Sequence, residues 1–294
     1  MRRVVTSNTS IYGLIGCPLE HSISPQIQNA AYAEMGLDAI YVPLHLRGRD
    51  IPDLVSAARD IGISGLNVTI PYKSAVISAL DWIDEVADMI GAVNVIHLGD
   101  EIRGYNTDVT ASMQSLREVS GPLAGKRVML VGAGGSARAV AFGLVREKAS
   151  LSIANRTLER AQSLASDIIS THPGVDIRVL DLGAMAAELG NQDVLINATP
   201  VGMYPRIGDS IVAPDSLRPD LTVMDLVYNP RDTMLLERAR QAGCRTVGGL
   251  RMLVYQAAES IEIWTGLEPP VEVMMSAATE AMSEFRTDTK ISTN

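Results

Sequence analysis

Cysteine is scarce in this sequence: Cys17 and Cys244 are the only two among 294 residues. So few cysteines exclude a framework of disulfides and favour a reducing, cytoplasmic setting. The four histidines are scattered, and they form neither a Cys/His metal pattern nor a Ser-His-Asp arrangement. Cys17 and His21 are four residues apart, but two ligands without partners do not define a site. We therefore expect no metal.

Aromatic residues and positive charge are also limited. Aromatics make up 4% of the chain, and 34 acidic against 25 basic residues give a net charge of −9. An acidic surface with few rings for base stacking is a poor match for nucleic acid or anionic membranes. The basic start Met1-Arg2-Arg3 runs into polar residues, and the longest charge-free stretch, residues 4–19, is interrupted by polar groups and Pro18. We expect neither a signal peptide nor a membrane span.

What the sequence does contain is an alternation of β-rich runs and helical patterns, in a chain long enough for two cores. This alternation is typical of α/β architecture with parallel strands. Strands are expected at residues 11–16, 39–46, 66–70, 93–98, 127–131, 150–154, 176–180, 193–197, 221–225 and 245–247. Helices are expected at residues 25–35, 51–60, 84–90, 135–146, 158–169 and 233–242, followed by a helical tail from residue 249 that Pro269-Pro270 divides.

Charge is distributed unevenly along the chain. Residues 1–106 hold 7 basic and 12 acidic side chains, residues 107–246 hold 15 of each, and residues 247–294 hold 3 and 7. Because most basic residues lie in the middle segment, that segment is the best candidate to hold a polyphosphate.

A glycine-rich turn opens the middle segment, between an apolar strand and a helix. Its residues are Gly132, Ala133, Gly134, Gly135, Ser136 and Ala137. The pattern G-x-G-x-x-A is weak alone, but its position inside a βα series favours a dinucleotide site over a turn without ligand. The glycines permit a tight turn and close approach of a pyrophosphate, which free N–H groups at the helix N-terminus can bind.

The end of the next strand indicates which dinucleotide binds. An NAD site places an acidic residue about 20 residues after the glycine turn. This chain has Asn155, Arg156 and Thr157 there, with Arg160 one helical turn later. Two guanidiniums and a hydroxyl can hold a 2′-phosphate that a carboxylate would repel, so we predict NADP(H).

Three clusters in the first part of the chain suggest chemistry. Ser24 with Pro25 predicts a helix N-cap followed by proline at the first helical position, and the hydroxyls of Ser22 and Ser24 would form a cradle for a carboxylate. Three further side chains, Asn67, Thr69 and Lys73, follow a strand at the sheet edge where ligands of α/β proteins bind. Asp108 precedes a helix and is expected to be a cap or first-turn acid. Spacing alone does not bring Lys73 to Asp108.

Together these segments resemble the shikimate dehydrogenase family over nearly the whole chain. The matching motifs, in order, are Ser22-Ile23-Ser24-Pro25, Asn67-Val68-Thr69-Ile70-Pro71-Tyr72-Lys73, Ala92-Val93-Asn94, Asn106-Thr107-Asp108, Gly132–Ala137, Asn155-Arg156-Thr157, Asn197-Ala198-Thr199-Pro200-Val201-Gly202-Met203, Asp225-Leu226-Val227-Tyr228-Asn229-Pro230 and Gly248-Gly249-Leu250-Arg251-Met252-Leu253-Val254-Tyr255-Gln256. The resemblance implies NADPH-dependent, reversible reduction of 3-dehydroshikimate to shikimate in aromatic amino-acid biosynthesis. It also implies an N-terminal α/β substrate domain (residues 1–106), a Rossmann-type NADP-binding domain (residues 107–246) and C-terminal helices (residues 247–294) that return to the substrate domain.

The resemblance assigns roles to individual residues. It implies that Ser22 and Ser24 hold the substrate carboxylate. Ring hydroxyls would be held by Asn67, Thr69, Asn94, Asp108 and Gln256, with Tyr228 lining the pocket. Lys73 would be the catalytic residue and Asp108 its charge partner, because an ammonium beside a carboxylate can protonate the alkoxide that hydride delivery creates. Further cofactor contacts would come from Thr199, Leu226, Gly249 and Met252.

Several alternatives stay open. Gln28, Val95 and Ala111 depart from residues that are common in the family, and they leave fine substrate preference undecided. A quinate/shikimate dehydrogenase ranks lower because Arg156 and Arg160 favour NADP. A folate-type methylene dehydrogenase fits the serine cradle poorly, and a non-catalytic, metabolite-sensing paralogue would be expected to have lost Lys73 or Asp108. The sequence does not decide between a monomer and a homodimer.

Overall fold

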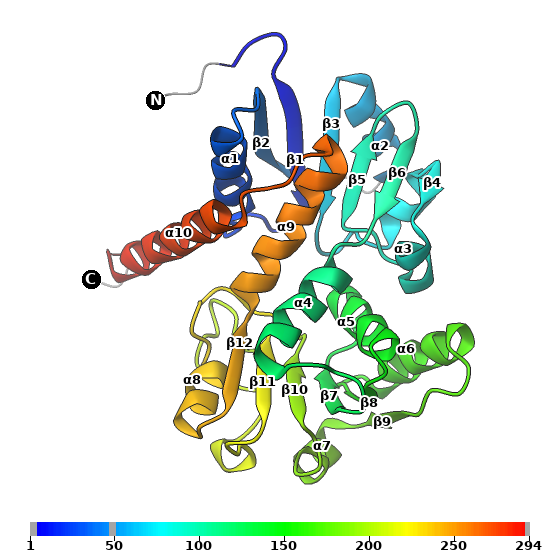
Figure 1. Cartoon of the computed structure of the whole chain (residues 1–294), viewed down its shortest axis with the longest axis vertical. Helices are drawn as coiled ribbons and strands as arrows, with labels where there is room; N and C mark the ends of the chain where they lie inside the picture. The colour runs from blue at the N-terminus through cyan, green and yellow to red at the C-terminus, as the bar shows by residue number, and fades with distance from the viewer. Residues whose placement is uncertain (1–4, 47–50, 292–294) are drawn as a thin grey trace. The chain divides into compact units, whose positions relative to one another are not determined.

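The computed structural model describes residues 5–46 and 51–291, so the start Met1-Arg2-Arg3 lies outside the described residues. The chain forms two compact units, each with its own sheet (Figure 1). The first unit contains the described residues up to Thr107 and those from Val254 onward, and the second contains Asp108–Leu253. No helix within the described ranges is both long enough and apolar enough to cross a membrane.

The described residues of the first unit form a mixed six-stranded sheet in the order β2-β1-β3-β5-β6-β4. The strands are β1 (Ser10–Gly16), β2 (Ala39–His45), β3 (Ile63–Val68), β4 (Trp82–Ile83), β5 (Val95–Leu98) and β6 (Ile102–Tyr105). β1 pairs in parallel with β2 and β3, as expected. The expectation of parallel strands is wrong for β5, which is antiparallel to both β3 and β6. Only residues 99–101 connect β5 to β6, and parallel neighbours would need a much longer crossover.

In the described part of this unit, six helical segments accompany the sheet, and the last two come from the end of the chain. They are α1 (Ser24–Glu34), α2 (Ile51–Asp60), the 3₁₀ helix η1 (Ala75–Ala79), α3 (Glu85–Ile90), α9 (Gly249–Thr265), whose residues from Val254 belong to this unit, and α10 (Val271–Ile291). Trp264 of α9 donates its indole N–H to the carbonyl of Ile96 (3.0 Å) and stacks on Tyr12 with ring centroids 4.8 Å apart. A Cβ at Gly65 would lie 2.4 Å from that indole nitrogen, so the sheet needs glycine there. The expected return of the C-terminal helices is confirmed.

The described part of the second unit forms a six-stranded parallel sheet in the order β12-β11-β10-β7-β8-β9. Its strands are β7 (Arg127–Val131), β8 (Ser150–Ala154), β9 (Ile177–Leu180), β10 (Val194–Asn197), β11 (Thr222–Asp225) and β12 (Arg245–Gly248). Its helical segments are α4 (Asp108–Ser120), α5 (Gly135–Arg146), α6 (Leu158–Thr171), α7 (Leu182–Leu189), η2 (Pro214–Ser216) and α8 (Met234–Gln241). The strand order reverses between β7 and β10, and ligands of such sheets bind at this switch point.

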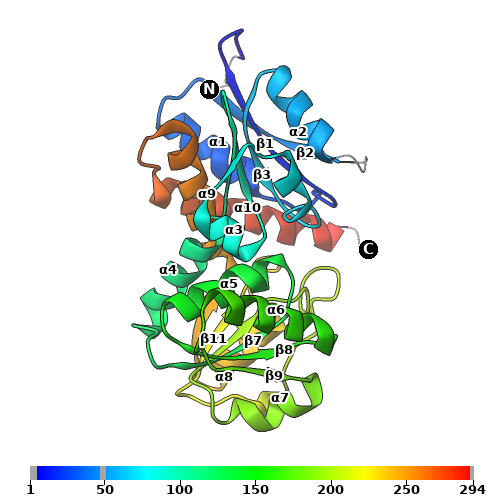
Figure 2. The same ribbon diagram turned by 90° about the vertical axis from the view of Figure 1, so that its right-hand side faces the viewer.

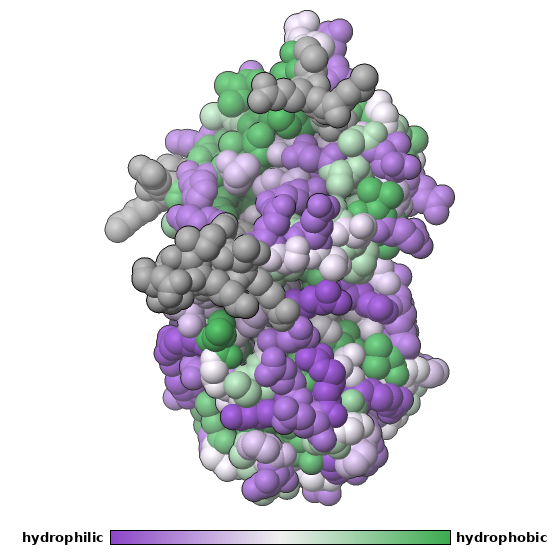
Figure 3. All heavy atoms as spheres, turned by 90° about the vertical axis from the view of Figure 1, so that its left-hand side faces the viewer, coloured by the Kyte–Doolittle hydropathy of each residue, from purple (hydrophilic) through white to green (hydrophobic). Residues whose placement is uncertain are grey.

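Helices enclose this second sheet, which explains its continuous apolar strands. α5 and α6 lie across one face (Figure 2). Met185 of α7 and Leu236 of α8 share a core cluster with Met129 and Leu195 of the strands. Strands buried on both faces have near-continuous apolar sequences, and β10 and β11 are buried along their whole length. Hydrophilic side chains cover most of this unit's visible surface in Figure 3.

Candidate active site

The predicted cofactor residues of the second unit all follow strands at the carboxyl edge of its sheet. Gly132 follows β7 with φ +122, and a Cβ there would lie 2.8 Å from the carbonyl oxygen of Ala198, which follows β10. The turns after the two strands at the switch point therefore touch, and only glycine fits between them. Gly134 is the N-cap residue of α5, so the helix N-terminus opens at the glycine turn. These features fit a bound pyrophosphate.

A second close approach lies between the turns after β11 and β12. A Cβ at Gly249 would lie 2.3 Å from the carbonyl oxygen of Leu226. Gly249 begins α9, and Met252 lies one turn further along that helix. Since Leu226 follows β11 directly, the structure brings Leu226, Gly249 and Met252 to the same edge as the glycine turn.

The turn after β8 carries the predicted phosphate-binding arginines. The Asn155 side chain donates to the carbonyl of Thr157 (2.7 Å), and Thr157 is the N-cap residue of α6. Arg156 and Arg160 are exposed, and neither forms an ion pair with any described residue. Arg138, by contrast, is paired with Asp167 (2.8 Å). Both guanidiniums at the end of β8 are therefore open to an anion.

A buried polar network behind this edge was not predicted. Asp225, at the end of β11, accepts from Thr233 Oγ1 (2.7 Å), Asn197 Nδ2 (2.9 Å) and the backbone N–H of Val227 (3.0 Å). Asn197 in turn accepts from the Thr199 hydroxyl (2.7 Å), so the network holds the turns after β10 and β11 together. Burial raises the pKa of Asp225 to about 6. Asn197, Thr199 and Asp225 lie in motifs that the family resemblance matched, but the sequence alone did not connect the two motifs.

In the first unit the structure brings Ser22 and Ser24 together. Ser22 Oγ donates to Ser24 Oγ (3.2 Å) and accepts from the Ser24 backbone N–H (3.3 Å). The prediction that Ser24 caps α1 is wrong by one residue: Ile23 is the N-cap residue, Ser24 is already helical, and no described side chain caps this helix. Because the Ser24 hydroxyl bonds to Ser22 instead of to a backbone N–H, the two hydroxyls form a pair at the helix N-terminus.

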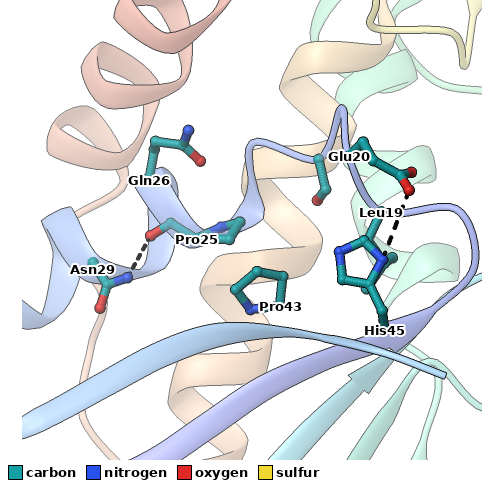
Figure 4. Close-up of a pocket in the computed structure, with 8 residues that line it drawn as sticks. Leu19, Glu20, Pro25, Gln26, Asn29, Pro43 and His45 are labelled. Atoms are coloured by element: carbon teal, nitrogen blue, oxygen red, sulfur yellow. Dashed lines mark hydrogen bonds and ion pairs between the residues drawn. The ribbon is translucent and has the colours of Figure 1, made fainter.

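A pocket of about 570 Å³ opens beside this pair (Figure 4). Ser22 lines it together with residues of α1 and β2 and of the turn before α1. Glu20 and His45 face each other across its rim, with 4.0 Å between Oε1 and Nδ1. Of the two serines, Ser22 lines the pocket, while Ser24 is buried beside it.

The remaining first-unit residues are clustered around the end of β3. Asn67 Nδ2 lies 3.2 Å from the carbonyl oxygen of Asn94, and the carbonyl of Lys73 accepts from the N–H of Val93 (2.8 Å). The backbone N–H of Thr107 donates to Asn94 Oδ1 (2.8 Å), and its hydroxyl donates to the carbonyl of Gln256 (3.1 Å). Hydrogen bonds thus connect Asn67, Asn94 and the backbone of Gln256, and the backbone of Lys73 is bonded to Val93, the neighbour of Asn94. Thr69 follows β3 directly and is half-buried, like Lys73.

Two predicted residues fall at the start of, or within, the second unit. Asp108 follows Thr107 directly, is the first residue of α4 and is 5% exposed, so it is a first-turn acid. Tyr228 lies in the turn after β11 and is half-buried. The pairing of Lys73 with Asp108 stays a prediction.

A parallel sheet in this strand order, with a glycine-rich turn at its switch point, defines the class of Rossmann-type dinucleotide-binding α/β proteins. Three family models match the chain: the shikimate dehydrogenase substrate binding domain over residues 14–96, shikimate/quinate 5-dehydrogenase over residues 114–235, and the shikimate 5′-dehydrogenase C-terminal domain over residues 249–279. The chain belongs to the shikimate dehydrogenase family.

Individual relatives match over most of their length. A shikimate dehydrogenase (NADP(+)) of Methanocaldococcus jannaschii is 41% identical over 96% of this chain and 100% of its own. The corresponding protein of Methanopyrus kandleri is 46% identical over 94% and 97%. A crystal structure of a shikimate dehydrogenase in complex with NADP+ has 41% identity, a TM-score of 0.90 and coverage of 95% and 98%. Quinate dehydrogenase from Corynebacterium glutamicum in complex with NAD has 34% identity, a TM-score of 0.87 and coverage of 92% and 99%.

Proposed function

We propose that this protein is an NADP-dependent shikimate dehydrogenase, which reversibly reduces 3-dehydroshikimate to shikimate. The observation that carries the proposal is the turn after β8, where two arginines without an ion-pair partner among the described residues occupy the place of an NAD-binding carboxylate. Its relatives over nearly the whole chain are named shikimate dehydrogenase (NADP(+)).

The second unit is proposed to hold the cofactor. The backbone of Gly132–Ala137 would bind the pyrophosphate, and Arg156, Thr157 and Arg160 the 2′-phosphate, with Asn155 shaping that turn. Thr199, Leu226, Gly249 and Met252 would line the rest of the site. When bound, NADPH supplies the hydride that reduces the ketone carbon.

The first unit is proposed to supply most of the residues that bind the substrate. The hydroxyls of Ser22 and Ser24 would hold its carboxylate without a nearby cation, because they lie at a helix N-terminus. Ring hydroxyls would be bound by Asn67, Thr69, Asn94, Asp108 and Gln256, with Tyr228 as pocket lining. The Lys73 ammonium would protonate the developing alkoxide, and Asp108 would stabilise that ammonium.

Steady-state kinetics with shikimate and quinate, each with NADP and NAD, tests the proposal. We expect kcat/KM to be highest for shikimate with NADP, by at least about tenfold over each other pair, as expected when one charge-assisted contact or one ring hydroxyl is mismatched. A preference for quinate with NAD would instead support the second candidate, a quinate dehydrogenase, which the similarity to the Corynebacterium glutamicum structure favours. No turnover of either substrate would contradict both.

Replacement of Arg156 by alanine tests the phosphate-binding role. We expect KM for NADP to rise about tenfold, because a charge-assisted hydrogen bond to the 2′-phosphate is lost, and KM for NAD to change less than about twofold. Arg146→Ala, which removes an exposed arginine at the end of α5, is the matched control and should change neither value. An equal change for both cofactors in Arg156→Ala would mean that this arginine does not distinguish them.

A further inference from the structure

A series of buried hydrogen bonds in the first unit runs through Asn67. The Tyr41 hydroxyl lies 2.8 Å from Asn67 Oδ1, while Asn67 Nδ2 lies 3.2 Å from the carbonyl oxygen of Asn94 and 2.9 Å from Ser260 Oγ. Tyr41 belongs to β2, Asn67 to β3 and Ser260 to α9. The exposed fractions of these three residues are 1%, 5% and 0%. Tyr41 and Ser260 are almost completely buried and each is hydrogen-bonded to the Asn67 side chain, so both are placed to act through Asn67.

Backbone carbonyls fix the direction of these bonds. The carbonyl oxygen of Asn94 can only accept, so the amide atom facing it must be the NH₂ group of Asn67; the opposite flip would bring two oxygens to 3.2 Å. Ser260 donates its hydroxyl proton to the carbonyl of Gln256 (2.8 Å) and therefore accepts from Asn67 Nδ2. The Tyr41 hydroxyl then donates to Oδ1, which only accepts.

With the bonds in this direction, the Asn67 amide can still accept one hydrogen bond but cannot donate another. Both of its N–H donors are used, and Oδ1 keeps one of its two lone pairs. We infer that Tyr41 and Ser260 are positioning residues, which hold the Asn67 amide in the orientation that presents Oδ1 to the substrate as a hydrogen-bond acceptor. This inference rests on the proposed function.

It follows that Asn67 and Lys73 bind different oxygen atoms of the substrate. The reacting oxygen is a ketone in one direction of the reaction, and a ketone only accepts, so it pairs with the Lys73 ammonium and not with Asn67 Oδ1. Asn67 therefore binds the O–H of a hydroxyl that does not react, at C4 or C5 of the ring. Burial raises the pKa of Tyr41 well above its ordinary value near 10, so its hydroxyl stays a donor throughout the neutral pH range.

The variant Tyr41→Phe removes the hydroxyl that donates to Asn67 Oδ1 and keeps the ring. Its kcat/KM is compared with that of the wild type for shikimate and for two analogues, one lacking the C4 and one lacking the C5 hydroxyl. For the wild type, kcat/KM should be about 10- to 100-fold lower with the analogue that lacks the Asn67-bound hydroxyl than with shikimate. The quantity compared is the ratio of kcat/KM for shikimate to kcat/KM for each analogue. In Tyr41→Phe the ratio for the analogue without the Asn67-bound hydroxyl should be at least about fivefold smaller than in the wild type. The ratio for the other analogue and KM for NADP should stay within about twofold of wild type.

Two further variants complete the experiment. Ser260→Ala removes the acceptor on the other side of the amide and should reduce the same ratio, which keeps the inference testable if Tyr41→Phe does not fold. Tyr12→Phe removes the hydroxyl of another buried tyrosine, outside this series of bonds, and should leave both ratios at the wild-type values. Unchanged ratios in Tyr41→Phe and Ser260→Ala beside an active wild type would overturn this inference alone. A wild type that does not oxidise shikimate would overturn the proposed function and, with it, this inference.

Discussion

Replacing Lys73 with alanine is expected to lower kcat for shikimate oxidation by about 10²-fold or more, the scale of a lost general acid–base group. The lysine is half-buried at the turn after β3, and its backbone is held by the bond between its carbonyl and the N–H of Val93 (2.8 Å). That bond does not involve the side chain, so the fold should survive the substitution. Initial rates at saturating shikimate and NADP measure the effect, and circular dichroism checks the fold.

Two other variants separate proton transfer from charge. Lys73→Arg keeps the positive charge, but a guanidinium does not release its proton near neutral pH, so turnover should stay low. Lys126→Ala removes a half-buried lysine just before β7 and should leave kcat within about twofold of wild type, as is usual for a surface substitution. Near-normal turnover in Lys73→Ala would remove this residue from catalysis. Recovery in Lys73→Arg would mean that charge, and not proton transfer, is its contribution.

The second unit could be predicted from the sequence in unusual detail because its signals are local. β7, β8 and α5 have the predicted bounds, since an apolar run bounded by polar residues defines each strand and the glycine turn defines the start of the helix. The strands of the first unit were harder to predict from the sequence. β4 has two residues, too few for any periodicity, and the antiparallel pairing of β5 follows from a short connection rather than from the composition of the strand.

The candidate site also contains features that the sequence predicts and features that it does not. The glycine turn and the arginines after β8 lie within single motifs, so their residue types and spacing were enough to predict them. The Asp225 and Tyr41 networks were not predicted, because each forms only when distant segments fold together: Asn67 and Ser260 are 193 residues apart, and Asn197 and Asp225 are 28 apart. No spacing rule connects such residues, and each of them alone is an ordinary polar side chain.

The Asp225 network predicts an unusual dependence of stability on pH. An aspartate has an ordinary pKa of 3.8, while burial raises the pKa of Asp225 to about 6 in the folded protein. Between these values the folded state holds a proton that the unfolded state has released, so the free energy of unfolding falls as pH rises through this window. The fall from this one carboxyl is about 3 kcal/mol. Urea unfolding of wild type and Asp225→Asn at a series of pH values measures it, because the contributions of all other groups cancel in the difference.

Asparagine suits this test because it preserves the network. Its oxygen can still accept from Asn197 and Val227, and its NH₂ group can donate to the Thr233 hydroxyl. Asp225→Asn should therefore gain stability relative to wild type as pH rises from about 4 to 6.5.

Asp193→Asn is the control of opposite sign. The hydrogen bond from the Arg127 guanidinium lowers the pKa of Asp193, so wild type loses that contribution as pH falls below the ordinary aspartate range. Asp193→Asn should therefore differ from wild type chiefly above that range, with the wild type the more stable. If the free energies of unfolding of wild type and Asp225→Asn depend on pH in the same way between about pH 4 and 6.5, the Asp225 carboxyl titrates normally. The turns after β10 and β11 would then be joined by a carboxylate that its three neutral donors fully stabilise.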